Sequence, residues 1–208
     1  MANVKLTELT EATTITPDDI IPIVDNPSGT PSTKKITEKN LFNARRLMSI
    51  VPAANFTLGT GITVQSAFPT TGDVFTLEGS TTYEIEGYYR ITKSGTTCTV
   101  GMAFALGGGA SVTSIEYYTL AQSAAVNTTG TAQDTCSVNQ VAATVVTATA
   151  TTAVWIKFSG LIRMNAGGTV TPQIIFSAAP TSPVMVANSY IKFTKIGTNT
   201  EDVIGNVA

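Results

Sequence analysis

The sequence predicts an all-β protein: an antiparallel β-sandwich, jelly-roll-like, preceded by a small mixed α/β N-terminal anchor segment. Three observations support this fold class. Only 12% of the 208 residues are charged, against about 25% in typical soluble domains. Threonine is unusually frequent, with 37 residues, and favours strands. The charged residues are also unevenly spread, with 12 in residues 1–50 and 14 in residues 51–208. We therefore predict an N-terminal attachment module (1–50) and a β-sandwich domain (51–208).

The N-terminal module is predicted to begin with a short helix. Thr16 is suited to cap it, Pro17 to occupy its first position, and Asp18 and Asp19 to interact with the positive end of its dipole. Pro22 limits this helix to about one turn, because proline lacks an amide donor.

Extended chain and a second helix are predicted next. Residues 21–24 favour a strand, residues 26–31 a turn, and residues 34–37 a second short strand. Thr37 is suited to cap a helix running from Glu38 to about Met48.

Fifty residues with so few apolar side chains cannot build a large core of their own. We expect the module to become ordered by docking on a partner or a neighbouring copy. The residues predicted to pack in that contact are Leu6, Leu9, Ile21, Ile23, Val24, Ile36 and Leu41.

The remainder of the chain is a series of β-branched or alternating segments separated by glycine- and proline-rich turns. In residues 83–91, for example, apolar side chains at odd positions alternate with polar or aromatic ones at even positions. The predicted strands are 74–79, 82–93, 97–106, 111–122, 137–149, 154–164, 169–177 and 190–196.

The low charge of this domain predicts self-association. Residues 94–153 contain only two charged side chains, Glu116 and Asp134. Isolated sheets usually protect their edges with charges, so we expect some outer face to be covered with threonine or buried against another copy. A symmetric oligomer is the simplest arrangement that achieves this.

Composition also excludes several functions. The chain has no histidine, which removes histidine-based triads and histidine zinc ligands. A net charge of −2 gives no basic surface for nucleic acid. Residues 135–156 carry no charge but are too rich in threonine for a membrane span, and the N-terminus lacks the apolar stretch of a secretory signal. We expect no membrane contact, no metal and no cofactor.

Candidate reactive groups are few. Glu84 and Glu86 lie two residues apart on a predicted strand, roughly 7 Å from each other on one face, a spacing compatible with paired glycosidase acids. The simpler interpretation, which we prefer, is a pair of solvent-facing carboxylates. The glycines at 107–109 and 59–61 lack the setting of a phosphate loop and favour turns. Asp18 and Asp19 offer too few oxygens for Ca²⁺.

Three tyrosines are candidates for surface recognition: Tyr88, Tyr117 and Tyr118. Neighbouring residues on a strand point to opposite faces, so one ring of an adjacent pair is expected outside. Tyrosine is frequent in recognition sites, although a half-buried strand position or a subunit contact is the more ordinary interpretation. Trp155 is expected in the core or a subunit interface.

The two cysteines, Cys98 and Cys136, lie in strand-like surroundings without metal-ligand spacing. We interpret them as small buried apolar residues. A disulfide and a reactive thiol are the alternatives.

The opening of the chain resembles that of many tailed-bacteriophage virion proteins, described as head or tail fibres and surface decoration proteins. The resemblance covers residues 4–42 and rests on 6–9 (LTEL), 12–15 (ATTI), 18–24 (DDIIPIV), 33–37 (TKKIT) and 40–41 (NL). It implies an N-terminal virion anchor and an outward β-domain, commonly a homotrimer, on the surface of a virion assembled in the host bacterial cytoplasm. The β-domain resembles fibre heads only in general character.

We therefore predict a non-enzymatic structural protein of a phage particle, attached to capsid or tail proteins through residues 1–50. Long fibres carry an extended shaft after such an anchor, and this chain has none, which favours a capsid decoration or cement protein or a short fibre. The alternative is a receptor-binding fibre head that recognises a host glycan or protein. A glycan-cleaving spike is disfavoured by the sparse carboxylates.

Overall fold

A computed structural model shows two compact units, Met1–Arg46 and Leu47–Ala208. The division predicted at residue 50 lies at Arg46 in the structure, because residues 47–50 pair with a strand of the second unit. The residues described by the structure are 20–25, 32–37, 47–70, 72–122 and 133–200.

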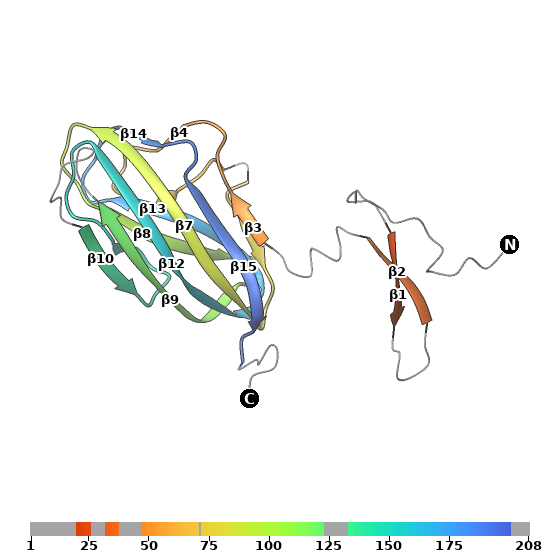
Figure 1. Ribbon diagram of the computed structural model, residues 1–208. Helices are drawn as coiled ribbons and strands as arrows, with labels where there is room; N and C mark the ends of the chain where they lie inside the picture. The colour runs from red at the N-terminus through yellow and green to blue at the C-terminus, as the bar shows by residue number, and fades with distance from the viewer. Residues whose placement is uncertain (1–19, 26–31, 38–46, 71, 123–132, 201–208) are drawn as a thin grey trace. The chain divides into compact units, whose positions relative to one another are not determined.

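The first unit contains one antiparallel hairpin, formed by β1 (Ile20–Asp25) and β2 (Ser32–Thr37), drawn in orange in Figure 1. Both strands were expected from the extended, β-branched pattern on either side of the turn residues, and both are confirmed. Ile21 is the cross-strand partner of Ile36. The predicted helix beginning at Thr16 lies outside the described residues.

The second predicted helix is wrong where it can be compared. Leu47 and Met48 belong to β3 (Leu47–Ile50), which pairs antiparallel with β15 (Tyr190–Thr198). Pairing with a strand distant in the sequence overrides the weak helical pattern of this segment. The rest of that predicted helix, 38–46, lies outside the described residues.

The second unit is the predicted antiparallel β-sandwich, with all ladders antiparallel (Figure 1). Its eight-stranded sheet contains β3, β4 (Phe56–Thr57), β7 (Thr81–Ser94), β9 (Ser111–Gln122), β10 (Gln133–Val138), β12 (Ala153–Ala166), β14 (Thr181–Met185) and β15. Its five-stranded sheet contains β5 (Gln65–Ser66), β6 (Phe75–Leu77), β8 (Val100–Gly107), β11 (Thr144–Val145) and β13 (Gly168–Phe176).

The strand order is jelly-roll-like because the chain crosses repeatedly between the two sheets. It passes from β7 to β8 in the opposite sheet and back to β9. β12 then enters between β7 and β9, and β13 pairs with β8. Neighbours in space are therefore often distant in sequence.

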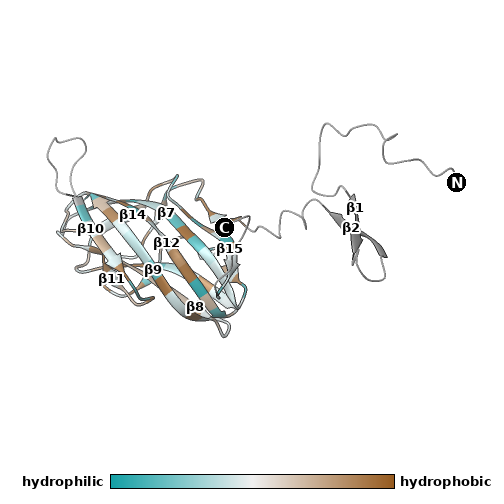
Figure 2. Cartoon of the chain, turned by 60° about the horizontal axis from the view of Figure 1, so that its bottom comes forward, coloured by the Kyte–Doolittle hydropathy of each residue, from teal (hydrophilic) through white to brown (hydrophobic). Residues whose placement is uncertain are grey.

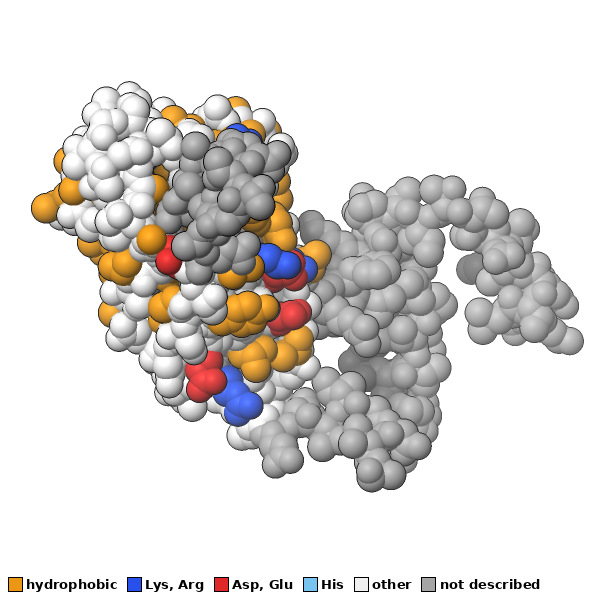
Figure 3. Space-filling model, turned by 60° about the vertical axis from the view of Figure 1, so that its left-hand side comes forward, with side chains coloured by type: hydrophobic (Ala, Val, Ile, Leu, Met, Phe, Trp, Pro, Cys, Tyr) orange, Lys and Arg blue, Asp and Glu red, His pale blue; other side chains and the backbone are white. Residues whose placement is uncertain are grey.

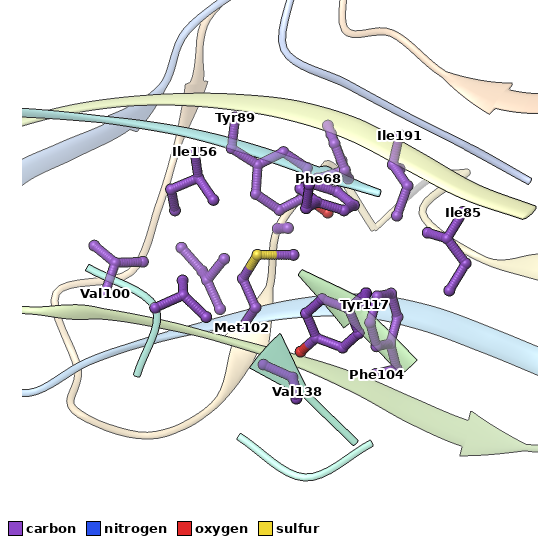
Figure 4. Packing of buried hydrophobic residues seen from close by; sticks show 14 of the residues in the cluster. Phe68, Ile85, Tyr89, Val100, Met102, Phe104, Tyr117, Val138, Ile156 and Ile191 are labelled. Carbon is purple, nitrogen blue, oxygen red and sulfur yellow. The ribbon is translucent and has the colours of Figure 1, made fainter. Parts of the chain in front are cut away.

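The core fills the space between the sheets, as the alternation predicted. The odd residues from Tyr83 to Ile91 on β7 face inward, and the even residues face outward. Figure 4 shows residues from both sheets meeting in this layer, including Tyr89, Met102, Phe104 and Ile156. Burying such large side chains contributes about 1.5–3 kcal/mol each.

Most predicted strands are confirmed, and 111–122 matches β9 in its bounds. Two predictions were wrong. The segment 137–149 is mostly irregular, with only the end of β10 and the short β11 in it. The proline-containing stretch between the predicted strands 169–177 and 190–196 was expected to be a turn, yet β14 begins there at Thr181. It contains a register irregularity between Thr181 and Val184 that accommodates Pro183.

Candidate functional site

The outward-facing side of the eight-stranded sheet, here called the outer face, carries the exposed aromatic and charged side chains. Figure 2 shows hydrophobic and hydrophilic segments alternating along β7, β9 and β12. Tyr118 is 55% exposed, Leu120 is 38% exposed and Leu161 is 41% exposed. Figure 3 shows hydrophobic side chains gathered among a few acidic and basic ones on the side where β9 and β10 lie.

Two of the three tyrosines predicted for recognition lie on the outer face. Tyr118 is exposed on β9, and Tyr88 is half-buried on β7. Tyr117 is the exception and corrects the prediction: it is 3% exposed and packs in the core, edge-on to Phe104. Burial raises the pKa of the Tyr117 hydroxyl. The register that turns Tyr118 outward necessarily turns Tyr117 inward.

Glu84 and Glu86 lie half-buried on the outer face, on the side of β7 opposite the core, as the simpler interpretation predicted. Glu86 is held by two neighbours on β15: Lys192 Nζ lies 2.6 Å from Oε2, and the Tyr190 hydroxyl donates to Oε1 at 2.9 Å. The hydrogen bonds from Lys192 and then Tyr190 lower the pKa of Glu86. A general acid needs a raised pKa, so Glu86 is unsuited to that role.

A second polar cluster on the outer face involves Trp155. The guanidinium carbon of Arg90 lies 5.8 Å from the centre of the Trp155 ring, a cation–π contact. Trp155 is half-buried on β12, so of the two predicted settings the core is wrong, and the subunit interface stays a prediction. The outward position of Arg90 and Trp155 could have been predicted from strand alternation alone. Their pairing required knowing that β12 lies beside β7.

The two sheets differ sharply in charge. None of the residues in β5, β6, β8, β11 and β13 is charged. In the strands of the eight-stranded sheet the described charged residues are Glu84, Glu86, Arg90, Lys93, Glu116, Asp134, Lys157, Arg163, Lys192 and Lys195. The uncharged outward positions of the five-stranded sheet include Ala105, Thr171, Gln173 and Ile175.

The described residues contain no cluster of side chains arranged as a catalytic or metal centre. Within them, no three side chains among His, Cys, Asp and Glu gather closely enough to hold a metal ion. Both cysteines are free, Cys98 fully buried and Cys136 half-buried, so the disulfide alternative is wrong. No helix within the described segments is long and apolar enough to cross a membrane.

The residues predicted to pack in the virion anchor are only partly described. Ile21, Ile23 and Val24 lie on β1, and Ile36 lies on β2. Leu6, Leu9 and Leu41 lie outside the described residues. The docking role of all seven stays a prediction.

The fold and its surfaces define an antiparallel β-sandwich with one charged and one uncharged sheet. No protein-family model matches the chain, and no curated protein matches it. Among solved structures, the chain is similar to a protein chain in the structures of the Gx and Gt strains of infectious bursal disease virus. The sequence identity is 14% in both cases, and the TM-scores are 0.24 and 0.22. The alignments cover 86% and 87% of this chain and 46% of the viral chains.

A third similar structure is the VP2 subviral particle of the same virus, with 13% identity and a TM-score of 0.18. The chain spans less than half the length of each of these proteins, since 46% of each is covered. At such low TM-scores the likeness carries no argument about function. The functional proposal therefore depends on the chain's own sequence and geometry.

Proposed function

We propose that this protein is a non-enzymatic structural component of a bacteriophage virion, a decoration or cement protein or a short fibre. Its N-terminal module attaches it to capsid or tail proteins, and its β-sandwich is displayed on the virion surface. The observation that carries the proposal is the charge asymmetry of the sandwich: the described charged strand residues all lie in the eight-stranded sheet. The resemblance of residues 4–42 to phage virion proteins directs it to a phage particle.

The asymmetry supports an assembled protein for a physical reason. Water-exposed sheets normally carry charged side chains that discourage unwanted association. The five-stranded sheet instead presents small and neutral side chains such as Ala105, Thr171 and Gln173, together with half-buried Ile175. We propose that this surface packs against other copies in a homotrimer, which leaves the charged outer face in solvent.

Attachment to the virion depends, in this proposal, on several weak contacts that act together. A module of about 50 residues with few apolar side chains would bind weakly as a single copy. Three modules in one oligomer raise the overall affinity, because the second and third bind at high effective concentration.

Electron microscopy of labelled particles tests this proposal. Gold-labelled full-length protein should bind to particles that lack it, at regular positions on the head or the tail. A chain without residues 1–46 should lose this binding. Absence of regular labelling by the full-length chain would overturn the virion role, whereas equal labelling by both chains would overturn the attachment role of the N-terminal module.

A further inference from the structure

A small groove opens on the outer face, between β7, β9 and β12. It has a volume of about 150 Å³ and is lined by Tyr88, Leu120, Ala121, Gln122, Trp155 and Lys157. Ligand pockets for whole drug-sized molecules are usually about 300–1,000 Å³. This groove is smaller than such pockets, so we expect it to hold one ring of a longer ligand and not a whole drug-sized molecule.

The strand register places these side chains in two neighbouring rows. Lys157 on β12 is the partner of both Tyr88 and Leu120. Two residues earlier, Trp155 is the partner of both Arg90 and Gln122. The groove thus combines two aromatic rings with the ammonium group of Lys157 and the amide of Gln122, and Arg90 stands at its border.

The charge around the groove is positive. Neither Arg90 nor Lys157 forms an ion pair with any residue in the described part of the chain. The carboxylate of Glu86 lies near Lys157 but is already bonded to Lys192 and Tyr190. An anionic group entering the groove would therefore meet two cations without carboxylate partners.

Aromatic faces carry partial negative charge, so they attract polarised C–H groups as well as cations. One face of a pyranose ring presents such C–H groups, while its hydroxyls need hydrogen-bond partners at the edge. Tyr88 and the face of Trp155 that Arg90 does not cover can supply the aromatic surfaces, and Gln122 can supply both a donor and an acceptor. A carboxylate on the sugar would complement Lys157 and Arg90.

We propose that this groove binds a single sugar ring that bears a carboxylate, such as one uronic acid residue of an acidic polysaccharide. The carbon skeleton lies against Tyr88 and Trp155, and the carboxylate is bound by Lys157 and Arg90. This site goes beyond the proposed structural role and does not depend on it, because it is tested on the purified chain without any particle.

Trp155 is the only tryptophan in the chain, so its fluorescence reports on this groove alone. Titration of the full-length protein with the methyl glycoside of glucuronic acid should change the emission in a saturable way. The methyl glycoside of glucose, which lacks the carboxylate, should bind at least about tenfold more weakly, since charge-assisted hydrogen bonds are the stronger ones. Added salt should weaken the glucuronide binding.

Variants distinguish this site from a general surface effect. Lys157→Gln should weaken glucuronide binding about tenfold or more, and Tyr88→Ala should weaken both sugars. Arg163→Gln is the matched control, because it removes an exposed cation from the same face of β12 outside the groove, and it should change nothing. Circular dichroism checks that each variant keeps its strands.

Three results would overturn the proposal. The first is no saturable change with the glucuronide, and the second is equal binding of the glucuronide and the glucoside. The third is Trp155 emission that depends on protein concentration in the absence of sugar, which would make the groove a contact between copies of this chain.

Discussion

The ring of Phe158 on β12 lies directly over the Cα of Gly87, its cross-strand partner on β7. A Cβ atom built on Gly87 would collide with three atoms of that ring. Phe158 is fully buried, and Tyr89 meets it edge-on with ring centres 4.9 Å apart. The absence of a side chain at residue 87 therefore lets two large rings share the centre of the sandwich.

Gly87→Ala should destabilise the protein by about 1–3 kcal/mol, the usual cost of overpacking a filled core. The ring of Phe158 has no free space to move into, because its neighbours are buried as well. Urea unfolding followed by circular dichroism measures the change. Gly61→Ala is the control, since a Cβ there meets only the hydroxyl and the backbone nitrogen of Thr63, at an ordinary 3.5 and 3.9 Å. Equal effects of the two substitutions would contradict the packing argument.

The Glu86–Lys192 pair should make stability depend on pH. Its hydrogen bonds lower the pKa of Glu86 in the folded state, while an unfolded glutamate titrates near about 4.3. The contribution is therefore complete above about pH 5 and is lost as the pH falls through the lowered pKa. Because the pair is partly exposed, it should contribute no more than about 1 kcal/mol.

Thermal unfolding of Glu86→Gln between neutral and strongly acidic pH measures this contribution. The stability difference from the wild type should be largest near neutrality and shrink on acidification. In a Lys192→Gln background the same substitution should lose most of this pH-dependent difference, because Lys192 is the principal cause of the lowered pKa. A difference that grows on acidification would have the wrong sign and would exclude the pair as its cause.

Alternation along single strands allowed much of the sandwich to be predicted from sequence, because burial on one face imposes a period of two. Contacts between strands could not be predicted in this way. Lys93 occupies an inward-facing position of β7, where a charged side chain is not expected. It is buried, and its ammonium group donates to the carbonyl of Ala150, far along the chain. That arrangement depends on the isolated bridge between Cys98 and Ala150, which no local pattern indicates.

The candidate site shows the same limit. The positions of Tyr88 and Tyr118 outside the core follow from alternation, and so does the burial of one tyrosine in each adjacent pair. The groove itself needs Trp155 and Lys157 to stand between Tyr88 and Gln122, which depends on β12 entering between β7 and β9. Strand order of this kind is a property of the whole chain rather than of any segment.

The two cysteines should differ in reactivity towards a thiol reagent. Cys98 is fully buried and forms the isolated bridge with Ala150, whereas Cys136 is half-buried on the edge strand β10. Iodoacetamide should therefore modify Cys136 in the folded protein and reach Cys98 only after unfolding, because reaction requires access to the thiolate. Peptide mass spectrometry after a time course locates the label. Modification of Cys98 at the rate of Cys136 would be inconsistent with its burial.

The uncharged five-stranded sheet leads to the prediction that most directly tests assembly. Gln173 lies near the middle of that sheet, on β13, between Ala103 of β8 and Ser66 of β5, with its side chain on the outward side. Gln173→Lys would place an ammonium group in a contact between copies, and burying such a charge is costly. Sedimentation velocity should show the proposed trimer of the wild type converted to monomers at the same concentration.

Thr113→Lys provides the matched control, because it adds the same charge at an exposed position of β9 in the other sheet. This variant should sediment as the wild type does, and both variants should retain the circular dichroism of the wild type. If both substitutions dissociate the oligomer, net charge rather than a specific surface governs assembly. If the wild type is itself a monomer at micromolar concentration, the absence of charge on the five-stranded sheet reflects some other contact, and the homotrimer must be abandoned.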